Sequence, residues 1–72
     1  MYRWLVVYTL KNGCKISGIY EGPEKDSLSA AQTLCNGIKP DMFISHFGID
    51  KTHMIGVRFG EIAAMDISVY KE

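Results

Sequence analysis

The stretch from Tyr2 to Leu10 constrains the fold of this chain more than any other feature of the sequence. It is a run of mostly aromatic and β-branched side chains, which favour strands. The run stops at Lys11-Asn12-Gly13, and Asn-Gly between two apolar runs is a strong hairpin signal. Gly adopts positive φ freely and Asn tolerates it, as a type I′ turn requires at both central positions. The sequence therefore predicts a hairpin with a two-residue loop.

A loop of this length fixes which side chains of the two strands share a face of the sheet. The first face then carries Leu5, Val7 and Thr9 from the first strand beside Tyr20, Gly18 and Ile16 from the second. The second face carries Trp4, Val6, Tyr8 and Leu10 beside Glu21, Ile19, Ser17 and Lys15. The first strand is apolar on both sides, which is typical of a strand inside a sheet. We therefore expect it to be central.

Length and composition indicate a single small domain, residues 1–72. Eight Lys and Arg balance eight Asp and Glu, so no net charge attracts the protein to nucleic acid or to anionic membranes. The sequence begins without a signal-peptide pattern, and no apolar stretch approaches the roughly 20 residues that span a bilayer. Two cysteines, Cys14 and Cys35, are too few for a typical secreted scaffold. We expect a soluble, cytoplasmic protein with two reduced thiols.

A helix is expected after Gly22-Pro23, which ends the second strand. Asp26 or Ser27 can cap its start, and it should run to about Asn36. Gly37 suits the left-handed position after the last turn, and Pro40 prevents continuation. The apolar stripe at helical spacing is Leu28, Ala31, Leu34, Cys35 and Ile38. We expect this stripe to pack on the face with Leu5, Val7, Ile16 and Tyr20.

Three further strands are expected, at about 42–47, 53–59 and 62–70, with a turn at 48–52. A helical turn at 61–65 remains an alternative to the start of the last strand, because Ala and Met favour helices. The predicted fold class is α+β. It is an antiparallel sheet of four or five strands with one helix packed on one face, in the order β-β-α-β-β-β, with a sheet able to curl toward a small barrel.

A family resemblance lies in the arrangement of most of the chain, with its turn at Leu10-Lys11-Asn12-Gly13 and its closing segment from Gly60 to Ser68. In these features the chain resembles small uncharacterised proteins of bacterial prophages and conjugative elements. The resemblance implies no activity and no catalytic residues. It implies a bacterial, cytoplasmic accessory role.

Candidate chemistry in the sequence is sparse. His46, His53, Cys14 and Cys35 are residue types that bind zinc, but their spacing matches no compact zinc motif. We therefore predict no metal and no cofactor, with both histidines at the surface. No phosphate-binding loop or nucleophile motif occurs, so we predict no catalytic residue and no enzymatic activity.

One helix covers one face of a sheet, which leaves the other apolar face in need of a cover. The predicted interaction face is Trp4, Val6, Tyr8, Leu10 and Lys15. Its cover is either the last strands of the same chain, folded over it, or a partner, which can be an unknown protein or a second copy. The sequence favours a non-enzymatic interaction or regulatory module of a mobile genetic element. The alternative is a nucleic-acid-binding module that uses an aromatic and basic sheet face.

Overall fold

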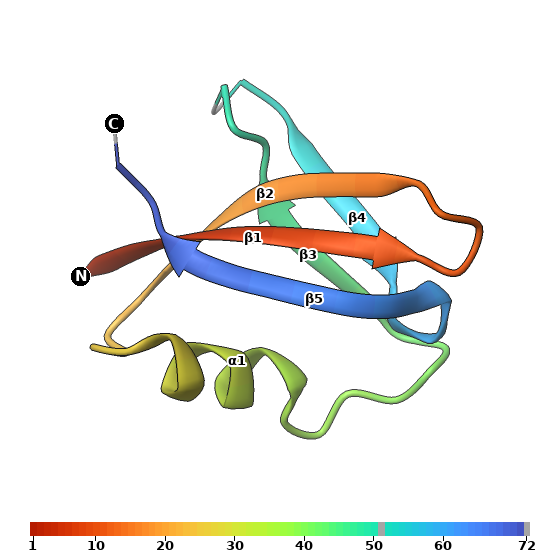
Figure 1. The fold of residues 1–72 in the computed structure, drawn as a ribbon. Helices are drawn as coiled ribbons and strands as arrows, with labels where there is room; N and C mark the ends of the chain where they lie inside the picture. Colours follow the sequence, from red (N-terminus) through yellow and green to blue (C-terminus); the bar gives the residue numbers. More distant parts are fainter. Residues whose placement is uncertain (51, 72) are drawn as a thin grey trace.

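The computed structural model of the protein describes residues 1–50 and 52–71. It confirms the α+β class, with one helix and strands in the predicted order (Figure 1). The elements are β1 (Tyr2–Leu10), β2 (Lys15–Gly22), α1 (Ser27–Cys35), β3 (Phe43–Phe47), β4 (Met54–Arg58), a short 3₁₀ helix η1 (Phe59–Glu61) and β5 (Ile62–Val69). The segment after β4 therefore forms one 3₁₀ turn, and the alternative helix at 61–65 is wrong beyond Glu61.

All strand pairs are antiparallel, and the five strands form one sheet in the order β4-β3-β2-β1-β5. β1 lies between β2 and β5, which confirms its predicted central position. Within the described residues, β4 and β5 are the edges of the sheet, so the sheet is open and not a barrel.

The β1–β2 hairpin differs from the predicted one by a single residue. Thr9 pairs with Lys15, and the connection is a three-residue loop in place of a two-residue type I′ turn. The N–H of Gly13 donates to the Leu10 carbonyl at 2.9 Å, and Gly13 has the positive φ of 91° that glycine adopts freely. The Asn12 side chain accepts a hydrogen bond from the Cys14 N–H at 2.9 Å, which stabilises this longer loop.

The shift of one residue exchanges the faces of β2 relative to β1. Trp4 now pairs with Tyr20, and Tyr8 pairs with Ile16, so these four side chains share a face. That face is the buried one, and α1 packs toward it. The predicted helix seat on the face of Leu5 and Val7 is therefore wrong.

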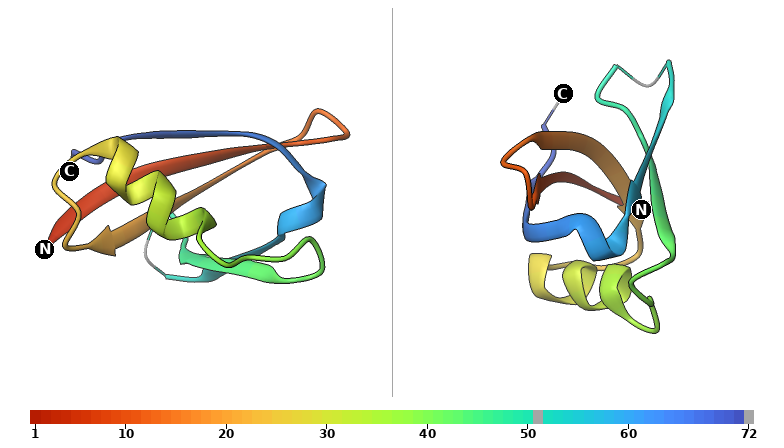
Figure 2. Two further views of the ribbon diagram at one scale, coloured as in Figure 1. Left: turned by 90° about the horizontal axis from the view of Figure 1, so that it is seen from below. Right: turned by 90° about the vertical axis from the view of Figure 1, so that its right-hand side faces the viewer.

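The sheet turns sharply between β2 and β3, which are joined by a single residue pair, Ile19 and Phe47. Beyond this point β3 and β4 stand at a steep angle to β1 and β2, and α1 lies across the open side between the two parts (Figure 2, right). The interior is the space enclosed by these three parts. Its buried cluster consists of Val6, Tyr8, Leu34, Ile44 and Val57.

The helix begins and ends where the sequence predicts, but its inward stripe differs. Asp26 is the N-cap and its carboxylate accepts the Ser29 N–H at 2.7 Å, while Gly37 follows the helix at φ 72°. The helix buries Ala30 and Leu34, whereas Leu28, at 68% exposure, points to solvent. Cys35 is also exposed, so two of the predicted stripe residues lie outside the core.

Candidate functional site

The predicted interaction face does not form one accessible surface. Trp4, Val6 and Tyr8 are buried, and Leu10 is half-buried against the core. Lys15 is exposed but pairs with Thr9, on the opposite face of the sheet. The hairpin register separates these residues. The strands β3 and β4 and the helix of the same chain cover the apolar face, and the predicted aromatic and basic platform is not formed.

A polar pair lies inside the core. The Tyr8 hydroxyl and Nε2 of His46 are 2.5 Å apart, and the two rings stack at 5.7 Å between centroids. Burial lowers the pKa of His46, while burial and then the nearby Cys35 raise the pKa of Tyr8 far above its usual range. His46 is thus neutral at pH 7, and its Nε2 and the Tyr8 hydroxyl share one hydrogen bond. The prediction that both histidines lie at the surface is wrong for His46, which is 5% exposed.

This pair predicts a loss of stability on mild acidification. An unfolded histidine has a pKa of about 6.5, and that of folded His46 is lower. The unfolded state therefore binds the extra proton more readily, and the free energy of unfolding falls as pH drops from about 7 toward 5, by up to about 1.4 kcal/mol per unit. Chemical denaturation across this range should show the fall in the parent and not in His46→Gln, whose amide oxygen can still accept from Tyr8.

His53 supplies the control for this experiment. Its Nδ1 lies 2.9 Å from the Asp50 carboxylate in the turn before β4, where both side chains are more than half exposed. The variant His53→Gln leaves the Tyr8–His46 pair intact and should keep the fall in stability that His46 causes. An equal slope in the parent and in His46→Gln would contradict the buried, neutral state of His46.

A second polar cluster joins β1, β2 and α1 around Glu24. Its carboxylate accepts the Tyr20 hydroxyl at 2.8 Å and the Thr33 hydroxyl at 3.1 Å, and its carbonyl accepts the Trp4 indole N–H at 3.3 Å. The bond from Tyr20 is the main cause that lowers the pKa of Glu24. Every partner comes from a different element, so the cluster holds the segment before the helix, and the last turns of the helix, against the sheet.

The candidate metal ligands do not come together. Within residues 1–50 and 52–71, no three His, Cys, Asp or Glu side chains are placed to hold a metal ion. Cys14 lies beside the hairpin loop and Cys35 at the end of α1, and both are free, exposed thiols. His46 belongs to the core and His53 to the turn before β4.

The outer face of β3 and β4 gathers exposed apolar side chains. Phe43, Phe47 and Met54 are 61%, 52% and 56% exposed, and Met42 and Ile49 extend the group at its ends. Phe43 pairs with Arg58 and Phe47 with Met54, so all four side chains stand on one face. The Arg58 guanidinium lies over the Phe43 ring, 5.6 Å from its centroid. We call Phe43, Phe47, Met54 and Arg58 the hairpin surface.

Sequence reasoning missed the hairpin surface because β3 is apolar on both faces. Its inner residues are Ile44 and His46, and its outer ones are Phe43 and Phe47. Alternation alone does not say which pair faces the core. The one usable signal was His46. If it pairs with Tyr8 on the inner face of the central strand, then Ile44 and His46 face the core, and Phe43 and Phe47 face outward.

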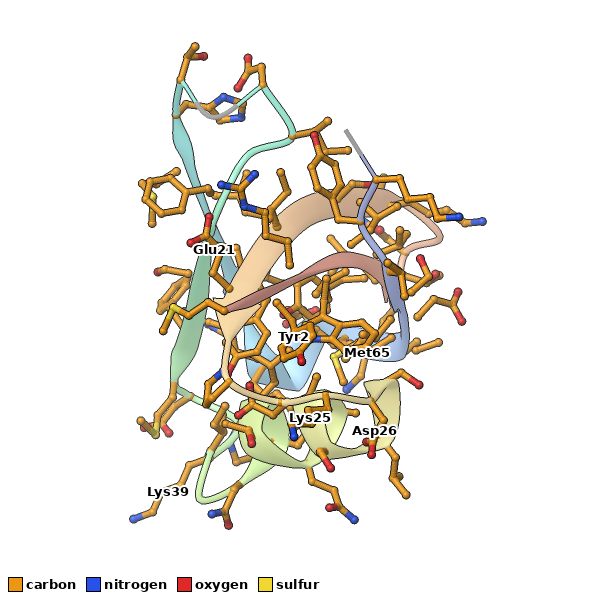
Figure 3. The ribbon with its side chains drawn as sticks, turned by 90° about the vertical axis from the view of Figure 1, so that its left-hand side faces the viewer. Tyr2, Glu21, Lys25, Asp26, Lys39 and Met65 are labelled. Carbon is orange, nitrogen blue, oxygen red and sulfur yellow. The ribbon has the colours of Figure 1, made fainter. Side chains whose placement is uncertain are left out.

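A second surface lies at the end of the molecule where the chain begins, seen from that side in Figure 3. It is a cleft of about 590 Å³, and Tyr2 and Lys25 lie near the middle of the view. Arg3, on its rim, pairs with Glu21 at 3.2 Å. The full lining is Met1, Tyr2, Arg3, Trp4, Lys25, Val69 and Tyr70. This cleft brings aromatic and basic side chains together, whereas the predicted aromatic and basic sheet face is not formed.

Comparison of the chain with protein-family models, with curated proteins and with solved structures finds no match. The described part of the chain contains no helix with the length and apolar character required to cross a membrane.

Proposed function

We propose that this protein is a small non-enzymatic interaction module and that the hairpin surface is where it contacts another protein chain. The observation that carries the proposal is the group formed by Phe43, Phe47 and Met54, each more than half exposed on one face. Exposed apolar side chains that gather on one face of a small domain mark interaction sites. We propose for it the accessory role in a bacterial prophage or conjugative element that the sequence resemblance implies.

The position of this surface suggests how a partner binds. β4 is an edge strand, so its outward backbone groups can pair with an added strand. An extended segment of a partner gains affinity from main-chain hydrogen bonds and specificity from side-chain contacts. On β4 such a segment would lie next to Met54 and Arg58, with the two phenylalanines one strand further in.

Selection of binding peptides from a random displayed library tests this proposal. We expect selected peptides to lose affinity by about tenfold or more for Phe47→Ser and Met54→Ser, as is usual for central apolar contacts. Leu28→Ser is the matched control, because Leu28 is at least as exposed as Phe47 and Met54 but lies on α1. Amide shifts on peptide binding should concentrate in β3 and β4. Binders that ignore these substitutions, or that shift other strands, would refute the proposal.

A second candidate is binding of single-stranded nucleic acid at the cleft lined by Tyr2, Arg3 and Lys25. Aromatic side chains for base stacking and cations for the backbone are the usual parts of such a site. The net charge of zero weakens the long-range attraction. Salt-dependent binding of a labelled oligothymidylate that Tyr2→Ala and Lys25→Ala abolish would favour this function.

A further inference from the structure

The free edge of β4 has a defined set of outward backbone groups. The Gly48 N–H donates to the His53 carbonyl, and the Phe59 N–H donates to the Met42 carbonyl. In an antiparallel ladder hydrogen-bonded and non-hydrogen-bonded pairs alternate. The N–H and C=O groups of Ile55 and Val57 therefore point to β3, and those of Met54, Gly56 and Arg58 point away from the sheet.

The other edge of the sheet differs, because α1 packs beside β5 (Figure 1). A helix along an edge strand blocks the approach of a further strand. Among the described elements, no strand or helix takes the corresponding place beside β4. β4 is also short, with Gly56 at its centre, where an added Cβ would meet nothing closer than the Ser45 hydroxyl at 3.9 Å.

We propose that the partner of this edge is a second copy of the same chain, with the two β4 strands antiparallel about a twofold axis at Gly56. The proposal rests on the proposed function, since it names the occupant of the same surface. In this register Gly56 faces Gly56 of the second copy, and Met54 faces Arg58. The outward groups of these three residues then all find partners, because a hydrogen-bonded antiparallel pair exchanges both N–H···O bonds.

The side chains are complementary in the same register. On the outer face each cross-strand row would run Phe43, Arg58 and then Met54 and Phe47 of the second copy, so the two hairpin surfaces join. On the inner face Ile55 would lie beside Val57 of the second copy, which extends an apolar row. A twofold axis makes such an interface isologous, the commonest type in homodimers. In such a dimer the two five-stranded sheets join through their β4 edges into one sheet of ten strands.

The first test removes a single outward donor. Gly56→Pro eliminates the N–H that points to the second copy, whereas the bonds from β4 to β3 come from Ile55 and Val57 and remain. Gly56→Ala keeps the N–H and is the matched control. In sedimentation equilibrium up to millimolar concentration we expect a dimeric parent, a dimeric Gly56→Ala, and Gly56→Pro weaker by about tenfold or more, because both copies lose a bond.

The second test reads the register and does not depend on the fold of the proline variant. Met54→Glu would place a carboxylate opposite Arg58 of the second copy, and Met54→Lys would place a cation there. We expect the glutamate variant to dimerise at least about tenfold more tightly than the lysine variant at low salt, with the gap closing at high salt. Equal affinities for the two variants would overturn the proposed register.

The two proposals fail in different ways. A parent that stays monomeric at millimolar concentration overturns the second copy as the occupant, while library peptides that bind β4 would still uphold the interaction module. A dimer that Gly56→Pro and the Met54 variants leave unchanged overturns pairing through β4. Loss of peptide binding to the hairpin surface, by contrast, overturns the proposed function itself.

Discussion

Val6→Lys is expected to unfold this protein. Val6 is fully buried in the cluster with Tyr8, Leu34, Ile44 and Val57. A lysine there would place an uncompensated charge in the core or force the core open, at a cost of several kcal/mol. A domain of this size has about 5 kcal/mol of stability to lose, so the variant should show no cooperative transition by circular dichroism.

Val7→Lys is the control, one residue along the same strand. Val7 is half-buried on the outer face, where its neighbours on β2 and β5 are Ser17 and Asp66. A lysine at this position can reach solvent and lies beside a carboxylate, so the variant should fold with a loss of about 1 kcal/mol or less. The reverse ranking, with Val6→Lys folded and Val7→Lys unfolded, would show that the helix covers the face of Leu5 and Val7.

The elements themselves could be predicted from the sequence, because their signals are local. The apolar character of β1 on both sides gave its central place, and Asp26 and Gly37 marked the ends of α1. The last strand was also predicted from its alternation, since Met65 and Ile67 pack against the core while Asp66 is exposed. These patterns depend on neighbours within a few residues of the chain.

The faces could not be predicted, because they depend on one residue of loop length. Asn12-Gly13 fits both a two-residue and a three-residue loop, and the choice decides whether Tyr20 lies with Trp4 or with Leu5. The helix seat, the buried face and the predicted interaction residues all followed from that choice. The hairpin surface could not be predicted either. Which face of β3 and β4 is exposed depends on α1 and β1 covering their inner face.

Gly18→Val is expected to destabilise the protein strongly, for a reason that the sequence does not show. Gly18 sits where β3 crosses close to β2, opposite Val6. A Cβ there would lie 2.8 Å from Cδ1 of Ile55 and 3.1 Å from the carbonyl oxygen of Phe47. The isoleucine can move but the carbonyl belongs to a paired strand, so the two parts of the sheet must separate. We expect a loss of about 2–3 kcal/mol or more, measured by chemical denaturation.

Gly56→Val is the control for Gly18→Val. It tests whether the loss of stability comes from lack of space for the side chain or from replacing any strand glycine with valine. Both glycines lie in strands at negative or extended φ, but an added Cβ at Gly56 has open space around it. Valine favours strands, so this variant should match or exceed the parent in stability by up to about 1 kcal/mol when measured in dilute solution.

Gly18→Val should also disturb the Tyr8–His46 pair, because Cβ of His46 lies 3.0 Å from the added atom. Its His46 pKa should then rise toward the ordinary value, since a wider gap between β2 and β3 admits water. If Gly18→Val melts with the parent and leaves the His46 titration unchanged, the close crossing of β3 over β2 is wrong, and with it the turn in the sheet that creates the interior.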